Sequence, residues 1–165
     1  MSDAAPLDQL YVLYREVDAL FANTSCPAST ECCRFGVTGR EPYVTALELH
    51  AIERALARRG GPLSAKRRAL PLHEHGDAQR ERTCPLLDRG NRCAVYADRP
   101  LGCRTFFCER ATRGDRDPRR ALREVVARLR QLEEQAQPFG SEARPLTRAL
   151  QERGLVAAER GATRR

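Results

Sequence analysis

The apolar positions of the chain recur mostly at helical spacing, which predicts a protein built mainly of α-helices. Near the start, apolar side chains recur at intervals of three or four residues: Leu7, Leu10, Leu13, Val17 and Leu20. Pro6 suits the first turn of a helix. Together these residues predict a helix over about residues 6–22.

A second helix is expected over about residues 46–59. Thr45 followed by Glu48 is the pattern of a capping box, in which each residue satisfies a backbone N–H of the other. An apolar stripe then runs through Leu47, Ile52 and Leu56, and Gly60 and Gly61 end it.

Two more helices are predicted towards the C-terminus. Asp117-Pro118 opens a helix of about residues 118–136, with its apolar stripe at Leu122, Val125, Val126, Leu129 and Leu132. A shorter helix over about residues 145–153 ends at Gly154.

The segments between these helices carry turn and loop signals. Residues 23–42 are rich in Ser, Thr, Gly and Pro, which predicts an irregular loop. Residues 64–70 suit a short helical turn, and residues 71–82 have no periodicity. Two short apolar runs flank Asp88-Arg89-Gly90-Asn91, a β-hairpin signal, and residues 98–102 are expected to form a turn.

Seven cysteines fall in these connecting segments, away from the predicted apolar stripes. They form two groups about fifty residues apart: Cys26, Cys32 and Cys33, then Cys84, Cys93, Cys103 and Cys108. Thiolates are soft anionic ligands, so such groups favour zinc or an iron–sulfur cluster. We expect the two groups to meet in space and to tie the first two helices to the hairpin.

Two other interpretations of the cysteines compete with a metal site. Inert core cysteines would be expected on apolar stripes, whereas these stand beside Pro, Gly and polar residues. A disulfide framework is disfavoured by the odd count and by an N-terminus without a signal-peptide pattern. That N-terminus predicts a cytoplasmic protein, where thiols are normally kept reduced.

The net charge of +7 comes from 28 Arg and a single Lys against 22 acidic residues. A basic surface attracts polyanions, but these basic residues are dispersed among acids and no aromatic platform accompanies them. The composition therefore does not favour a nucleic-acid partner, and no apolar stretch is long enough to cross a membrane.

The second cysteine group carries a specific motif. It contains Cys84-Pro85-Leu86-Leu87, Cys93-Ala94-Val95-Tyr96, Arg99-Pro100 and Cys103-Arg104-Thr105-Phe106, and Cys108 follows. This order resembles the YkgJ-type cysteine-cluster family, the CxxCxxCC domains associated with zinc or iron chelation. The resemblance covers about residues 20–112 and implies metal binding.

The first group departs from that family's pattern. Counting from Cys26, the second cysteine of the pattern falls on Ser29, while Cys32 and Cys33 fit the closing pair. Either the full set is not required, or Ser29, water or another group completes the site. A related cysteine arrangement in flagellin lysine methylases is associated with an iron–sulfur cluster, which favours iron.

Seven thiols exceed the four that one tetrahedral zinc ion or one four-iron cluster takes. This favours a polynuclear site, or one full site with spare thiols. Adjacent Cys32 and Cys33 are expected to bind different metals, or one of them to be a spectator.

Few other residues stand out chemically. His50 is interpreted as a helix-face residue, and His73 and His75 as part of a polar loop that could lend a ligand. Arg99 and Arg104 are expected to donate hydrogen bonds to thiolates or to backbone carbonyls, and a solvent-facing Arg104 is an equal alternative. The chain has no protease, phosphate-binding or dinucleotide-binding motif.

The sequence therefore predicts a mostly α protein, a small helical domain with cysteine-bearing loops and one short β-hairpin organised around a metal site. Residues 1–112 are expected to form the metal-binding domain, residues 113–156 helices packed on it, and residues 157–165 a frayed tail. The favoured function is to hold an iron–sulfur cluster or zinc. The alternatives are a redox or group-transfer enzyme with an open-site iron–sulfur cluster, and a thiol redox sensor.

Overall fold

The computed structural model describes residues 4–20, 30–63, 82–88, 90, 92–105, 119–136 and 142–156, and the structural statements below concern these residues. They are mostly helical, as predicted. The longer helices are α1 (Ala4–Leu20), α3 (Ala46–Arg58), α5 (Arg119–Gln135) and α6 (Leu146–Glu152). Each confirms a predicted helix, and for α1, α3 and α5 that prediction came from apolar spacing. The predicted turn at 64–70, most of the loop at 71–82 and the tail at 157–165 lie outside the described residues.

Four short helical elements replace parts of the predicted loops: η1 (Glu31–Cys33), α2 (Phe35–Thr38), η2 (Tyr96–Asp98) and α4 (Leu101–Arg104). The prediction that residues 23–42 form an irregular loop is thus wrong for residues 31–33 and 35–38. The expectation that the cysteines avoid helices is wrong for Cys32, Cys33 and Cys103. Single turns carry no apolar repeat, so hydrophobic spacing cannot reveal them.

The two-stranded sheet joins distant parts of the chain. β1 (Tyr43–Val44) pairs antiparallel with β2 (Arg144–Pro145), with Tyr43 opposite Pro145. Sequence analysis did not predict this pairing. The predicted hairpin is present as a tight reversal with an isolated antiparallel bridge between Leu87 and Cys93.

The start of α3 confirms the predicted capping box. The Thr45 hydroxyl accepts a hydrogen bond from the Glu48 N–H (3.3 Å), and Glu48 Oε2 accepts one from the Thr45 N–H (3.0 Å). At the other end, Gly60 and Gly61 take φ angles of 100° and 107°, which L-residues with side chains rarely adopt.

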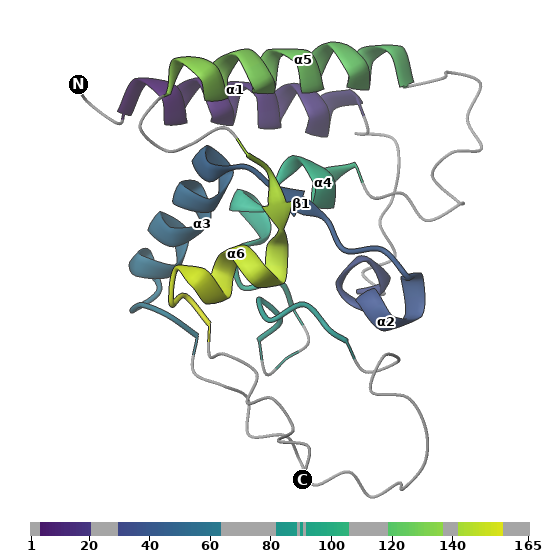
Figure 1. Ribbon diagram of the computed structural model, residues 1–165, viewed down its shortest axis with the longest axis vertical. Coiled ribbons are helices and arrows are strands. Elements are labelled where there is room, and N and C mark those ends of the chain that lie inside the picture. Colours follow the sequence, from purple (N-terminus) through teal and green to yellow (C-terminus); the bar gives the residue numbers. More distant parts are fainter. Residues whose placement is uncertain are drawn as a thin grey trace, which may run out of the picture.

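Two apolar clusters lie on opposite sides of α3. α1 and α5 lie side by side along one side of the molecule, and α6 lies on the other side of α3 (Figure 1). The α1–α5 cluster holds Leu7, Leu10, Leu13, Tyr14, Val17, Leu47, Ala51, Leu101, Val125, Leu129, Leu132 and Ala136. Since α3 supplies Leu47 and Ala51 here and Ile52 and Leu56 to the second cluster, it joins both.

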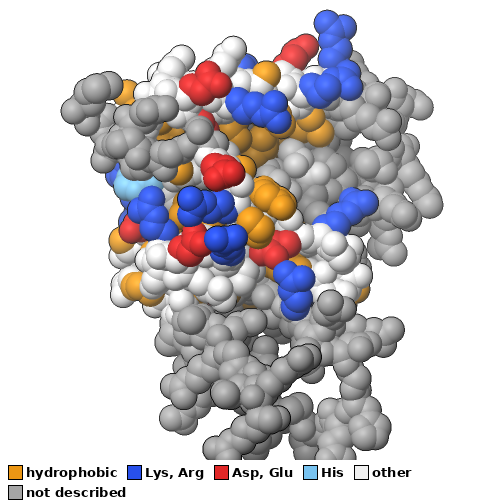
Figure 2. All heavy atoms as spheres, in the orientation of Figure 1, with side chains coloured by type: hydrophobic (Ala, Val, Ile, Leu, Met, Phe, Trp, Pro, Cys, Tyr) orange, Lys and Arg blue, Asp and Glu red, His pale blue; other side chains and the backbone are white. Residues whose placement is uncertain are grey.

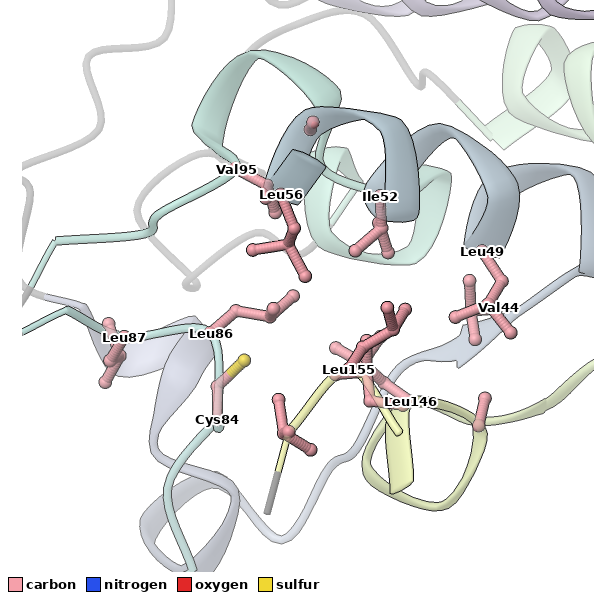
Figure 3. Packing of buried hydrophobic residues seen from close by; sticks show 14 of the residues in the cluster. Val44, Leu49, Ile52, Leu56, Cys84, Leu86, Leu87, Val95, Leu146 and Leu155 are labelled. Atoms are coloured by element: carbon pink, nitrogen blue, oxygen red, sulfur yellow. The ribbon is translucent and has the colours of Figure 1, made fainter. Parts of the chain in front are cut away.

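The second cluster, called here the cysteine-side cluster, packs α6 and β1 against the cysteine-bearing turns. It holds Phe35, Val44, Leu49, Ile52, Ala55, Leu56, Cys84, Leu86, Leu87, Val95, Leu146, Ala149, Leu150, Leu155 and Val156. Figure 3 shows the Cys84 sulfur among these side chains, close to Leu86. Cys33, Cys93 and Cys103 are half-buried against the same cluster, so the apolar core extends directly to the thiols.

Glu48 is a buried carboxylate, 2% exposed, that joins three helices. Besides capping α3, its Oε1 accepts hydrogen bonds from the Leu101 N–H (2.7 Å) at the start of α4 and from the Tyr14 hydroxyl (3.3 Å) on α1. Burial raises the pKa of Glu48, while the hydrogen bonds it accepts oppose that shift. The side chain thus satisfies donors from α1, α3 and α4 at one point.

The charged residues of the described surface are mixed. On the face drawn in Figure 2, Arg side chains lie among Asp and Glu side chains. Ion pairs such as Glu16–Arg128 and Arg148–Glu152 account for several of them. Within the described part of the chain, no helix combines the length and apolarity needed to cross a membrane.

Replacing Glu48 by Gln should destabilise the fold by about 1–3 kcal/mol, because an amide NH₂ would then face a backbone N–H donor in a buried site. Urea denaturation measures this change. Glu53→Gln is the matched control, since that half-exposed carboxylate of α3 makes only surface ion pairs and its loss should cost at most about 0.5 kcal/mol. Equal stability of the two variants would contradict the role assigned to Glu48.

Candidate metal centre

The structure places five of the seven candidate cysteines on four separate segments. Cys32 and Cys33 lie on η1, Cys84 precedes a tight turn, Cys93 follows it, and Cys103 lies on α4. The described cysteines are all free thiols. Cys26, Cys108, Ser29, His73 and His75 lie outside the described residues.

A direct backbone contact brings the two cysteine groups together. The Cys84 N–H donates to the Cys33 carbonyl at 2.6 Å, and the Gly36 N–H donates to the Arg82 carbonyl at 2.9 Å. The segment around η1 therefore runs alongside the segment before Cys84. This confirms, for the described members Cys33 and Cys84, that the two groups about fifty residues apart in sequence meet in space.

A tight turn then brings Cys93 back to Cys84. The Ala94 N–H donates to the Leu86 carbonyl at 2.8 Å, and the Asp88 carboxylate accepts from the N–H groups of Gly90 (2.8 Å) and Arg92 (2.9 Å). An Asp at this position favours such a turn because its side chain replaces a backbone acceptor.

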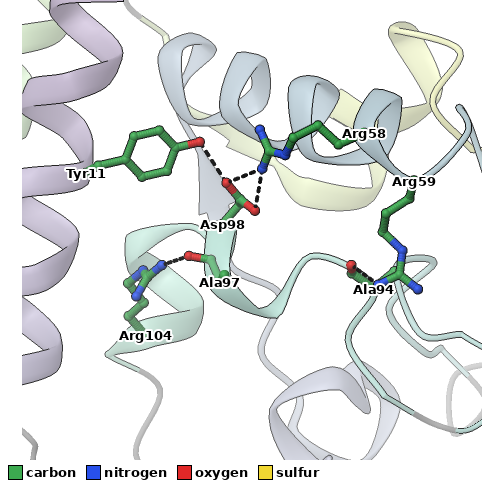
Figure 4. Close-up of polar contacts among 7 residues, drawn as sticks. All are labelled: Tyr11, Arg58, Arg59, Ala94, Ala97, Asp98 and Arg104. Atoms are coloured by element: carbon green, nitrogen blue, oxygen red, sulfur yellow. Dashed lines mark hydrogen bonds and ion pairs between the residues drawn. The ribbon is translucent and has the colours of Figure 1, made fainter.

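The backbone from Ala94 to α4 is held by three charged side chains to which sequence analysis gave no role. Asp98 accepts two hydrogen bonds from Arg58 (2.9 and 3.0 Å) and one from the Tyr11 hydroxyl (2.7 Å), as Figure 4 shows. Arg59 donates to the Ala94 carbonyl at 2.7 Å. In the sequence, the position of Asp98 between Tyr96 and Arg99 of the cysteine motif could have indicated a role for it near the site.

Arg104 is 7% exposed and turns its charge inward. It donates to the carbonyls of Ala97 and Arg99, pairs with Asp18, and lies over the Tyr14 ring at 4.1 Å. The expectation that Arg104 binds backbone carbonyls is confirmed, and the solvent-facing alternative is wrong. Arg104 therefore positions the backbone between Cys93 and Cys103.

Gly102 allows α4 to approach β1 closely. A Cβ at this position would stand 3.0 Å from the Cβ of Pro42, a contact tighter than side chains normally make. Glycine at this site thus lets the neighbouring Cys103 lie against the segment that leads into β1.

The Sγ atoms of the adjacent Cys32 and Cys33 lie 3.8 Å apart. A tetrahedral zinc site with Zn–S bonds of ~2.3 Å has sulfur–sulfur edges of ~3.8 Å. The separation is therefore compatible with both thiols binding one ion, and their assignment to different metals stays a prediction.

The pKa values of Cys32, Cys33 and Cys103 are raised by burial and by neighbouring thiols. A hydrogen bond with Cys33, then burial, raises the pKa of Cys32. The bond to Cys32 lowers the pKa of Cys33, but contact with Cys84 and burial outweigh it and bring that pKa to about 12. Burial, then the nearby charges of Cys93, Cys32 and Cys33, raises the pKa of Cys103. A bound cation would favour the ionised form of these thiols and would lower their pKa values.

Arg99 supplies part of that positive charge. Its positive charge lowers the pKa values of Cys32 and Cys93, although burial and neighbouring thiols outweigh it. The guanidinium lies 4.0 Å from the centre of the Tyr96 ring and 3.6 Å from Asp18, and its Nε is buried without a hydrogen-bond partner among the described residues. Arg99 thus acts on the thiols through its charge, and the expected hydrogen bonds from its side chain to thiolates or carbonyls are not found among the described residues.

The described residues hold the thiols near one another without forming a complete coordination sphere. Among them, no three Cys, His, Asp or Glu side chains converge closely enough to hold a metal ion. His50 lies away from the thiols on α3, half-buried, with Glu53 at 3.5 Å, which agrees with its interpretation as a helix-face residue. The donor chemistry is that of soft, thiolate-bound metals.

A small helical fold with free thiols gathered from distant segments defines a cysteine-cluster domain. The family model of the CxxCxxCC domain, described as "Putative zinc- or iron-chelating domain", matches residues 25–122, which is more than half of the chain. The chain belongs to this family, as its cysteine motif indicated. Comparison with curated proteins and with solved structures gave no match.

Replacing Arg104 by Lys should destabilise the protein by about 2–3 kcal/mol, because one ammonium cannot reproduce the guanidinium hydrogen bonds to two carbonyls and a carboxylate. Thermal unfolding measures the loss. Arg148→Lys is the control, since Arg148 is an exposed residue whose ion pair with Glu152 contributes little. An Arg104→Lys variant as stable as Arg148→Lys would show that Arg104 does not fix the segment between Cys93 and Cys103.

Proposed function

We propose that the protein binds an iron–sulfur cluster or zinc through a ligand set drawn from Cys26, Cys32, Cys33, Cys84, Cys93, Cys103 and Cys108. The observation that carries this proposal is the backbone contact between Cys33 and Cys84, which joins two of the four segments that carry the five described free thiols. Membership of a chelating-domain family supports the same conclusion.

The chemistry of the cluster favours a bound cation over free thiols. Each ionised thiol raises the cost of ionising the next, and a soft cation bound by several thiolates removes that cost. When bound, the metal supplies a positive centre that cross-links the four segments. Arg99 offsets part of the negative charge that several thiolates bring to one metal.

The position of the thiols favours a structural role for the metal. Cys84 is 5% exposed inside the cysteine-side cluster, and Cys33, Cys93 and Cys103 pack against it. Metal binding at these thiols would therefore stabilise the packing of α6 against the face of α3 that carries Ile52 and Leu56. The α1–α5 cluster contains no cysteine and would depend on the metal much less.

We expect Cys84→Ser, Cys93→Ser and Cys103→Ser each to lower the metal content of the protein to about half or less, because a hydroxyl is a harder and far less acidic ligand than a thiol. Elemental analysis of anaerobically purified protein gives zinc and iron per chain, and a brown colour distinguishes a cluster from zinc. Cys32→Ser, Cys33→Ser and Ser29→Cys show whether the adjacent pair acts together and whether position 29 faces the site.

The matched control for Cys84→Ser is Leu87→Val, which removes one methylene from the same apolar cluster and leaves every thiol in place. It should keep the full metal content at a stability cost of about 1 kcal/mol. Full metal in all three serine variants would refute the ligand set. Loss of metal in Leu87→Val would mean that the serine variants report on packing.

Removing the metal with a chelator should loosen the cysteine side of the molecule first. Hydrogen exchange should speed up in residues 32–38, 84–95 and 146–150, which belong to or border the cysteine-side cluster. Helices α1 and α5 should keep their protection, because their cluster is packed without sulfur ligands. Unchanged exchange in all three segments would contradict the coupling of metal to folding.

A further inference from the structure

An open groove of about 720 Å³ leads from the surface to the thiols. One wall comes from Phe35 and Gly36 of α2, and another from the stretch that runs from Gly39 into β1. Cys32 and Cys103 line it together with Gly102, the glycine that packs against Pro42. The volume is in the range of small-molecule sites.

The groove carries a net positive charge. Its charged lining residues are Arg40, Glu41 and Arg82. Glu41 is already neutralised, because its Oε2 pairs with Arg82 at 2.6 Å and its Oε1 accepts the Thr147 N–H at 2.7 Å. No ion pair of Arg40 is found among the described residues, so two cations and one anion leave a charge of +1 beside an available guanidinium.

The rest of the lining suits an organic skeleton. Tyr43 is 61% exposed although it lies on β1, and Pro42, Pro145 and Phe35 present further apolar surface to the groove. A guanidinium binds a carboxylate through two parallel hydrogen bonds, and apolar walls favour the carbon chain that carries it. A bare inorganic anion would leave those walls unused.

We propose that this groove binds a small organic carboxylate, with Arg40 pairing its carboxylate and the ligand extending towards Cys32 and Cys103. The groove gives such a ligand direct access to the thiols that the proposed function assigns to the metal. A second carboxylate of the ligand can then act as an exchangeable donor to that metal, and this last part rests on the proposed function.

The test is isothermal titration of tricarballylate, a tricarboxylate without the hydroxyl that makes citrate a strong chelator, into the full chain as purified. Arg40→Gln and Arg40→Glu change the groove charge from +1 to 0 and −1. Each step should weaken binding by about threefold to tenfold, and added salt should weaken binding to the parent protein. Inorganic phosphate should bind more weakly than tricarballylate.

Arg123→Gln and Arg123→Glu are matched controls, because they change the net charge equally at an exposed position of α5. They should leave binding within twofold of the parent protein. Equal effects at positions 40 and 123 would overturn the groove, and phosphate binding as tight as tricarballylate would overturn the organic ligand.

Metal content is measured on the same samples to separate the two proposals. The Arg40 variants should keep their metal, since Arg40 supplies no soft donor. A parent protein without metal that still binds tricarballylate through Arg40 would refute the proposed function and leave the groove standing. If the Arg123 variants lost tricarballylate binding at full metal content while the Arg40 variants kept it, the anion site would lie elsewhere and the proposed groove site would be refuted.

Discussion

The buried carboxylate of Glu48 is the interaction on which the arrangement of this protein depends. It caps α3, accepts the first N–H of α4 and receives the Tyr14 hydroxyl of α1. A carboxylate has enough lone pairs to satisfy all of these donors, whereas an amide or a hydroxyl has too few acceptors. Because α4 carries Cys103, the same side chain that begins α3 also sets where one edge of the thiol cluster lies.

Sequence patterns predicted the helices in which apolar residues recur at regular spacing, and they missed the short elements that have no such recurrence. The helices at 4–20, 46–58 and 119–135 bury apolar stripes that were recognised from spacing, and the helix at 146–152 was predicted with its end at Gly154. The pairing of β1 with β2 joins two dipeptides about one hundred residues apart, and no local pattern marks it. The single turns at η1 and α4 are set by tertiary contacts such as the Glu48–Leu101 hydrogen bond, which is equally invisible in sequence.

The candidate site shows the same division. The cysteine motif predicted that two distant groups would meet, and the contact between Cys33 and Cys84 confirms it. The residues that hold them in place were harder to foresee. Asp98 acts through Arg58 and Tyr11, which lie on two other helices, and Arg104 acts through carbonyls whose direction depends on the local turn. Asp98 and Arg104 of the motif thus fix the backbone between Cys93 and Cys103.

The place of α6 in the core has a consequence for how the chain acquires its structure during synthesis. Leu146, Ala149 and Leu150 cover the apolar cluster that contains Cys84, and β2 secures β1 only once residue 145 has left the ribosome. A nascent chain therefore leaves Cys84 uncovered until residues 146–150 have been synthesised, since domains assemble from the N-terminus as they emerge. The packing of α6 over the cysteine-side cluster is therefore a late step, which follows the synthesis of every cysteine-bearing turn that it covers.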